Sequence, residues 1–264
     1  MNFTVDGRQA FAYTAAHAVD PARPTVVFVH GAGLDHSVFG LQSRYFGYHG
    51  RNVLAADLPA HGRSGGPPLA TVVEMADWVV RLLDAAKVGK AAIVGHSMGS
   101  LVALECAARH PTRIERIALL GTAYPLQVGE AFMDAARRND HAAYDMETIW
   151  GHSPQAAIGA NPNPGMSMYG ESLARLERLA PGVLHNDLKA CHAYAGGEAA
   201  VAKLQCPVLF VLGRRDQMTP AKAGAAFAKT VPDAQVVMLE ASGHSLMSET
   251  PDATLDALIA FFRN

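Results

Sequence analysis

The sequence predicts an α/β protein with a doubly wound, mostly parallel sheet, covered by helices on both faces and interrupted by one helical insertion. Short apolar runs alternate with longer amphipathic stretches through the first half of the chain, which is typical of such a sheet. The alternation stops near residue 121 and resumes near residue 205. The 264 residues, half of them apolar, are enough to bury one sizeable core.

Six segments are predicted as strands, because each is a short apolar run that ends in glycine or in polar residues. Buried parallel strands have this pattern. The segments are 25–30, 52–57, 91–96, 114–121, 206–213 and 235–239.

Helices are predicted where apolar residues recur every three or four positions. In the core, the predicted helices are 71–86, 97–109, 221–230 and 251–262. Between the predicted strands 114–121 and 206–213 they are 130–138 and 171–179, divided by the Pro/Gly-rich stretch 161–165. We assign 1–121 and 205–264 to the core and 122–204 to a helical cap. An insertion that follows the carboxyl end of a strand should cover the edge where open α/β sheets bind ligands.

Composition and charge restrict the partners. The net charge of −2 and the lack of a polybasic run give no attraction for nucleic acid or an anionic membrane, so we expect a small-molecule substrate instead. The N-terminus does not resemble a secretory signal, and no apolar run approaches the roughly 20 residues that span a bilayer. A cytoplasmic location is therefore expected. The oligomeric state is not predicted.

The cysteines and the candidate metal ligands give negative predictions. Cys106, Cys191 and Cys206 are too scattered for a disulfide framework or a metal site, so we expect buried thiols. A cluster in the sequence suggests metal ligands, but no spacing in it places two ligands on one helix face; its members are His30, Asp35, His36, Asp57 and His61. We expect no metal and no cofactor.

Residues 95–99 (GHSMG) fit the pattern G-x-S-x-G, with a predicted strand before them and a predicted helix after them. A sharp strand-to-helix turn places the serine in a strained conformation with its Oγ exposed at the sheet edge. The helix that follows directs N–H groups and its positive dipole end toward a developing oxyanion. Ser97 is therefore the predicted nucleophile.

A serine hydroxyl needs a base, and the base needs a carboxylate that orients it. His244 lies in a polar loop after the last predicted strand, and Asp216 follows the strand that ends at residue 213. The chain order Ser97, Asp216, His244 is the order that this kind of site uses. Glu240 is too close to His244 and is interpreted as a solvated charge.

Other histidines are assigned structural places. His17, His49, His110, His141 and His152 are expected at the surface, and His96 is expected to pack beneath the serine turn. The loop His30-Gly31-Ala32-Gly33 supplies backbone N–H groups that, with the N–H of Met98, could converge on one oxygen.

These motifs resemble the α/β-hydrolase superfamily, in particular compact bacterial esterases with a helical cap. The resemblance rests on HGAG at His30, DLPAHGRSGG from Asp57, GHSMG around Ser97, GRRDQMTP around Asp216 and ASGHSLMSETP around His244. It implies an α/β-hydrolase fold, a Ser-His-Asp triad, and an oxyanion hole made by the backbone N–H groups of Ala32 and Met98. Gly33 is the less favoured donor.

The resemblance implies a serine hydrolase that cleaves carboxylic esters of small to medium size through an acyl-enzyme. Carbon–carbon bond hydrolysis, lactone hydrolysis and cofactor-free perhydrolysis use the same triad and stay open, as does a ligand receptor on the same fold. A dinucleotide site is disfavoured because His36 stands where its third glycine is needed. The residues expected to line a substrate pocket are Gly31, Phe132, Trp150, Met166 and Met168.

Overall fold

The computed structural model describes residues 1–159 and 167–263, and in them eight strands form one sheet in the order β1-β2-β4-β3-β5-β6-β7-β8. The strands are β1 (Asn2–Val5), β2 (Arg8–Tyr13), β3 (Thr25–Val29), β4 (Asn52–Ala56), β5 (Ala91–His96), β6 (Ile114–Leu120), β7 (Val208–Gly213) and β8 (Gln235–Leu239). All pairings from β4 to β8 are parallel. The predicted doubly wound, mostly parallel sheet is confirmed.

The antiparallel hairpin of β1 and β2 was not predicted. Its two-residue turn is Asp6-Gly7, and both residues have positive φ angles, of 52° and 73°. Asp-Gly between alternating residues is a strong signal for a hairpin turn of this kind, because both turn positions need the left-handed conformation. The signal was therefore present in the sequence, and β2 extends the sheet beyond β4 through an antiparallel pairing.

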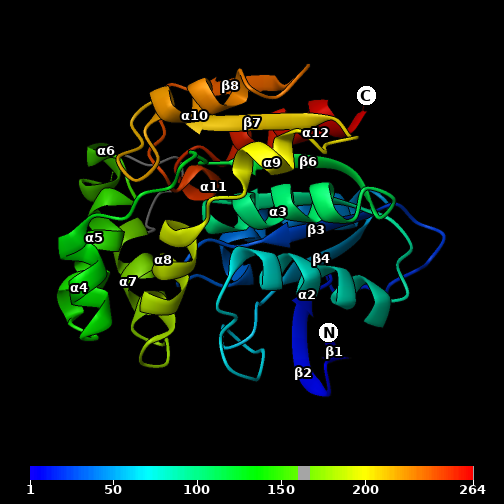
Figure 1. Ribbon diagram of the computed structural model, residues 1–264, viewed down its shortest axis with the longest axis horizontal. Coiled ribbons are helices and arrows are strands. Elements are labelled where there is room, and N and C mark those ends of the chain that lie inside the picture. Colours follow the sequence, from blue (N-terminus) through cyan, green and yellow to red (C-terminus); the bar gives the residue numbers. More distant parts are fainter. Residues whose placement is uncertain (160–166, 264) are drawn as a thin grey trace.

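Helices cover both faces of the sheet (Figure 1). Helices α2 (Val72–Ala85) and α3 (Met98–Arg109) pack together on one face, and α1 (Gly40–Tyr48) and α12 (Pro251–Arg263) on the other. Helix α10 (Ala221–Ala228) packs on β7, and the short helices η1 (His36–Phe39) and α11 (Leu246–Glu249) lie in loops. Strands β3, β4 and β5 are buried along their whole length, so they position whatever follows them rigidly.

Between β6 and β7, where the insertion was predicted, the described residues form six helices. They are α4 (Glu130–Arg137), α5 (His141–Trp150), α6 (Pro154–Ala157), α7 (Met168–Leu176), α8 (Val183–Ala193) and α9 (Gly197–Val201). Figure 1 shows α4, α5, α7 and α8 grouped beyond one end of the sheet, whereas α9 returns to pack on α3. The predicted Pro/Gly-rich divider 161–165 lies outside the described residues.

Two further observations concern the sequence predictions. Cys106 and Cys191 are buried and free, but Cys206 is half-buried, because it precedes β7 at the end where the chain enters the sheet; the expectation of burial was wrong there. Within residues 1–159 and 167–263, no helix has the length and apolar character needed to cross a membrane.

Candidate active site

The carboxyl ends of the parallel strands bring the predicted site residues to one edge of the sheet (Figure 1). Ser97 follows β5, the 30–33 loop follows β3, Asp216 follows β7 and His244 follows β8. In an open α/β sheet this edge is where ligands bind. The helices α4, α5, α7 and α8 lie at the same end.

Ser97 occupies a strained strand-to-helix turn with φ 53° and ψ −118°. Its N–H donates to the carbonyl of Leu120 at 2.9 Å, which keeps the turn tied to the sheet. The flanking glycines are needed sterically, since a Cβ at Gly95 would collide with the carbonyl of Gly99, and a Cβ at Gly99 with that of Val29. The sequence thus forces the serine side chain out of the sheet edge.

Asp216 and His244 form a buried pair. His244 Nδ1–H donates to Asp216 Oδ2 at 2.8 Å, and both side chains are almost fully buried. Asp216 Oδ1 accepts the N–H groups of Met218 and Thr219 at 2.9 and 2.7 Å, and the Thr219 hydroxyl donates to Oδ2 at 2.7 Å. These donors fix the carboxylate, and the carboxylate fixes the imidazole ring.

Thr219 was missed in the sequence, although an Asp followed by a hydroxyl residue three positions later is a local turn signal. The structure also separates Asp216 from the neighbouring arginines: Arg214 pairs with the exposed Glu240 at 3.0 Å instead. Glu240 therefore lies outside the buried pair.

The pair stabilises charge on both partners. Burial alone would lower the pKa of His244, but the charge of Asp216 and the hydrogen bond raise it above the ordinary 6.5. Burial would likewise raise the pKa of Asp216, but His244 and the hydrogen bonds from Thr219 hold it below the ordinary 3.8. Asp216 is thus an anion at neutral pH, ready to stabilise an imidazolium.

The second nitrogen of His244 is free. Among the described residues, His244 Nε2 is buried without a hydrogen-bond partner, and no hydrogen bond joins it to Ser97. Hydrogen bonds of a catalytic base are often long before substrate binds.

The His244 ring is closely packed. Gly121, at φ 54°, makes room for the ring, since a Cβ there would lie 3.1 Å from His244 Nδ1. His96 Nε2–H donates to the His244 carbonyl at 2.9 Å, so His96 is buried against the loop that carries the base.

Two backbone N–H groups near Ser97 are also free. In the part of the chain that the structure describes, neither Ala32 N nor Met98 N donates to a protein acceptor, whereas Gly33 N–H donates to Asp187 Oδ2 at 3.0 Å. Gly33 is therefore engaged in the fold. This agrees with the lower rank that the sequence gave it as an oxyanion donor.

Asp187, on α8, belongs to a buried ion pair that sequence analysis missed. Its Oδ2 also accepts His61 Nε2–H at 2.8 Å, and His61 Nδ1–H donates to the carbonyl of Pro59 at 3.0 Å. Burial would lower the pKa of His61, but Asp187 raises it; burial would raise the pKa of Asp187, but His61 lowers it. Both ring nitrogens face acceptors, an arrangement that favours the charged imidazolium, and the pair joins α8 to the core.

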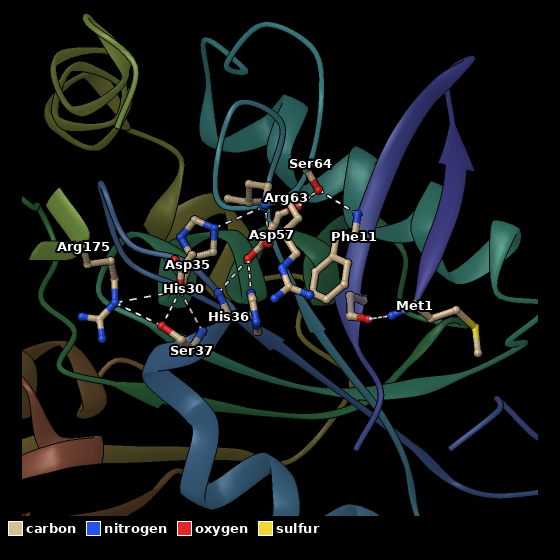
Figure 2. Close-up of polar contacts among 12 residues, drawn as sticks. Met1, Phe11, His30, Asp35, His36, Ser37, Asp57, Arg63, Ser64 and Arg175 are labelled. Carbon is tan, nitrogen blue, oxygen red and sulfur yellow. Dashed lines mark hydrogen bonds and ion pairs between the residues drawn. The ribbon is translucent and has the colours of Figure 1, made fainter. Parts of the chain in front are cut away.

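Asp57 organises the segments that follow β3 and β4 (Figure 2). Its Oδ1 accepts the backbone N–H and the Nδ1–H of His36, at 2.8 and 2.7 Å, and its Oδ2 accepts Arg63 N–H at 2.8 Å. Ligand atoms of Asp35, His36 and Asp57 lie within 4.8 Å of one another, a spacing compatible with a metal. The protein hydrogen bonds nevertheless account for both Asp57 oxygens.

Two cavities border the site. The Ser97 cavity, of about 170 Å³, is lined by Ala32, Ser97 and residues of the inserted helices that include Phe132, Trp150 and Leu188. The His244 cavity, of about 240 Å³, is lined by His96, His244 and residues that include Met168 and Arg175. Glu147, on α5, is the one described residue that lines both.

The residues expected in the pocket are placed as follows. Phe132 and Trp150 line the Ser97 cavity, and Met168 lines the His244 cavity. Gly31 lines neither and lies beneath the serine turn, where a Cβ would be 3.1 Å from Ser97 Cβ. Met166 lies outside the described residues.

His152 was predicted at the surface, and this was wrong. It is 4% exposed, and its Nδ1–H donates to the carbonyl of Thr148 at 2.8 Å. The chain turns back toward the His244 loop after α5: Ser245 N–H donates to the carbonyl of Gly151, and the Glu249 carboxylate accepts N–H groups from Ser153 and Gly243. These contacts bury His152 and join the end of α5 to Gly243 and Ser245, the residues before and after His244.

Comparison with known proteins supports the sequence resemblance. A pimeloyl-acyl-carrier-protein methyl ester esterase of Chromobacterium violaceum is 30% identical over 241 residues, 84% of this chain and 87% of that protein. The dihydrolipoyllysine-residue acetyltransferase component of the acetoin cleaving system of Pseudomonas putida is 30% identical over 254 residues, 90% of this chain. That alignment spans 63% of the acetyltransferase.

A solved structure has the same fold. The enol-lactonase from Burkholderia xenovorans LB400 superposes with a TM-score of 0.88 at 23% identity, with both chains fully covered. The Alpha/beta hydrolase family matches residues 26–257, which hold the strands β3 to β8 and the helices between them but not the hairpin of β1 and β2. The chain therefore belongs to the alpha/beta hydrolase family.

Proposed function

We propose that this protein is a serine hydrolase that cleaves carboxylic esters of small to medium size through an acyl-enzyme. One observation carries the proposal: His244 is held by the Asp216 carboxylate through Nδ1, and its Nε2 is free at the sheet edge where Ser97 stands on a strained turn. A nucleophile, a base and an orienting acid in this chain order are typical of acyl transfer.

In the proposed mechanism, His244 Nε2 takes the Ser97 proton as Oγ bonds to the substrate carbonyl carbon. The Ala32 and Met98 N–H groups donate to the resulting oxyanion. The bond to the leaving oxygen then breaks, and the departing alcohol takes the proton from His244. Water, losing a proton to His244, adds to the acyl-enzyme, and Ser97 leaves with that proton to release the acid.

The two cavities suit the two halves of an ester. The leaving alcohol must receive a proton from His244, so we assign it to the His244 cavity. The acyl group then occupies the Ser97 cavity, whose about 170 Å³ compares with the roughly 150 Å³ engineered cavity that binds benzene. A small to medium acyl group fits this volume.

We assign residues 122–204 as the cap of this site. Phe132 on α4, Trp150 on α5 and Leu188 on α8 line the Ser97 cavity, so the inserted helices form a wall of the acyl site. The chemistry needs no metal or cofactor, because the chain itself supplies nucleophile, base and oxyanion donors. The expected small-molecule partner and the cytoplasmic location stay predictions.

Two of the similar proteins are consistent with hydrolysis of an ester bond, whereas a 2-hydroxymuconate semialdehyde hydrolase, 28% identical over 212 residues, is named for a different substrate. Of those two, one is named a methyl ester esterase, and the solved structure with the same fold is an enol-lactonase. A lactone is a cyclic ester and requires the same four steps. Carbon–carbon cleavage, perhydrolysis and a receptor role remain outcomes of the test.

The test is a substrate screen with turnover counting. Purified protein is incubated with p-nitrophenyl esters, lactones, thioesters and carbon–carbon hydrolase substrates, and product is counted per molecule of protein. Ester or lactone turnover over many cycles, absent in Ser97→Ala, is expected. Product that stalls near one equivalent would favour a receptor, and turnover confined to carbon–carbon substrates would overturn ester hydrolysis.

A further inference from the structure

Glu147 stands between the two cavities of the site. It lies on α5 one turn before Gly151, whose carbonyl accepts the N–H of Ser245, the residue after His244, at 2.9 Å. The Glu249 carboxylate accepts Gly243 N–H and Ser153 N–H at 3.0 and 2.8 Å and holds the same junction from the other side. This end of α5 is therefore fixed against the base, and Glu147 with it.

The carboxyl group of Glu147 is buried without a full set of partners. The residue is 8% exposed, and its Oε2 has no hydrogen-bond donor among the residues that the structure describes. A buried polar atom left unsatisfied costs about 1–3 kcal/mol, and such atoms in folded proteins require an explanation. Asp216, Asp187 and Glu249, the other buried carboxylates near the site, each accept at least two hydrogen bonds.

The walls around Glu147 on the acyl side combine apolar and uncharged polar side chains. Phe132, Trp150, Leu188 and Met218 line the Ser97 cavity, and Glu147 is the one carboxyl group among the described residues of that lining. Burial raises the pKa of Glu147 to about 7; His244 lowers it and Asp187 raises it. A group that is partly protonated near neutrality can accept or donate a hydrogen bond, but it is a weak partner for an ammonium ion.

We propose that Glu147 is a specificity residue that binds an uncharged hydrogen-bond donor, a hydroxyl or amide N–H, on the acyl group of the substrate close to the scissile carbonyl. The inference rests on the proposed function and narrows it to hydroxy- or amido-substituted acyl esters. Position supports this, because Glu147 lines both the cavity assigned to the acyl group and the cavity assigned to the alcohol. A site that hydrogen-bonds a substrate donor discriminates strongly against analogues without it.

The experiment compares matched p-nitrophenyl esters: butyrate, 2-hydroxybutyrate, 3-hydroxybutyrate and 3-methoxybutyrate. The methoxy ester keeps the oxygen and removes the donor. In the wild type, kcat/KM for the better hydroxy ester should exceed that for butyrate and for the methoxy ester by roughly 10- to 100-fold, the range for a hydrogen bond to a charged or partly charged group.

Two variants and one control locate the effect. Glu147→Leu should bring kcat/KM for the hydroxy ester down to that for butyrate in the same variant, and Glu147→Gln, which keeps the shape and one acceptor oxygen, should retain part of the preference. Asp145→Leu, on the exposed face of the same helix, should leave the preference unchanged. If Glu147→Leu fails to fold, the methoxy comparison in the wild type and the Glu147→Gln variant still decide.

Binding separates this inference from the function on which it rests. In Ser97→Ala, calorimetric Kd values for the same esters should show the same preference for the hydroxy ester, and Glu147→Leu in that background should abolish it. Turnover without any hydroxyl preference would overturn the role of Glu147 and leave the hydrolase intact. If no ester is turned over but binding shows a hydroxyl preference that depends on Glu147, the role of Glu147 is kept and the hydrolase function is overturned. A stronger preference for a 3-amino ester would contradict an uncharged donor.

Discussion

Ser97 holds a backbone conformation, φ 53° and ψ −118°, that glycine adopts freely and other residues adopt with strain. Such a conformation costs of order 1–3 kcal/mol and persists where the surrounding structure enforces it. Here the enforcement is the hydrogen bond from Ser97 N–H to Leu120 and the two glycines that let neighbouring chains pass close. The strain has a use, since it holds Oγ out of the sheet beside two free N–H groups.

The pH dependence of activity should follow the protonation of His244. The imidazole must be neutral to accept the Ser97 proton, and its pKa is raised above 6.5 because the Asp216 charge and hydrogen bond outweigh burial. Therefore kcat/KM should be low at acid pH and rise with a slope of one through an apparent pKa above 6.5. A pH series with a p-nitrophenyl ester measures this.

Asp216→Asn provides the control for that profile. Loss of the carboxylate removes the charge and the tautomer control, so kcat should fall by about 10⁴-fold, as in the serine protease template. Glu240→Gln, which removes an exposed carboxylate at the end of the neighbouring strand, should change neither kcat nor the profile. A loss of less than tenfold in Asp216→Asn would assign the orienting role to another group.

Sequence alone singled out Ser97, Asp216 and His244 as candidates, because each follows a strand and has a short local pattern around it. Glu147 and Asp187 escaped detection for a physical reason. Each lies on a helix of the inserted segment, where only periodicity is visible, and Asp187 meets Gly33 across 154 positions of the chain. Contacts of that kind exist only after the sheet has brought distant segments together.

At the scale of elements, α8 is tied to the loop that carries Ala32. Asp187 accepts Gly33 N–H, so it fixes the loop one residue from a proposed oxyanion donor. Asp187→Ala should therefore lower kcat by roughly 10- to 100-fold with a smaller change in KM, less than the 10²- to 10³-fold loss of a complete oxyanion donor. Steady-state kinetics at 25 °C measure the split, and Asp134→Ala, an exposed aspartate of α4, is the matched control.

The same ion pair should make stability depend on pH. The pKa of Asp187 is lowered below 3.8, so its contribution is present above that pH and is lost as pH falls through the folded value. The pKa of His61 is raised above 6.5, so its contribution is full below 6.5 and is lost as pH rises through the folded value. The difference in unfolding free energy between wild type and Asp187→Asn should be largest between pH 3.8 and 6.5. Urea titrations that give a constant difference from pH 4 to 9 would refute a charged pair.

The elements themselves were predictable to different degrees. The six core strands appear in the sequence within one or two residues of their observed bounds. Those inside the sheet are continuous apolar runs because they are largely buried on both faces, and the edge strand β8, although partly exposed, is also an apolar run. The hairpin of β1 and β2 was missed, since β1 has only four residues, β2 begins with two exposed polar residues, and the Asp6-Gly7 turn is the clearest mark of the pair. Helices α5 and α8 were not predicted as separate elements, because they pack on several neighbours and their apolar faces are interrupted by the buried Glu147 and Asp187.

For the whole molecule, the bounded Ser97 cavity should set the acyl length. Each buried CH₂ contributes about 0.8 kcal/mol, or roughly fourfold in kcat/KM, until the cavity of about 170 Å³ is full. Across p-nitrophenyl esters from acetate to palmitate, kcat/KM should rise, reach a maximum at a short to medium chain and then fall. Phe132→Ala, which removes part of the wall and so enlarges the cavity, should move the maximum to a longer acyl chain. A monotonic rise to palmitate would indicate an open, lipase-like surface.

The central claim is that Ser97 is the nucleophile, and covalent labelling tests it most directly. A fluorophosphonate reacts when an activated serine oxygen bonds to phosphorus and fluoride leaves, so it marks the nucleophile itself. Peptide mass spectrometry of the labelled wild type should find one phosphonylated residue, Ser97. The adduct should be absent from Ser97→Ala, which should also lose several powers of ten in ester turnover. A label on another serine, or a Ser97→Ala variant that keeps most of its activity, would contradict the account.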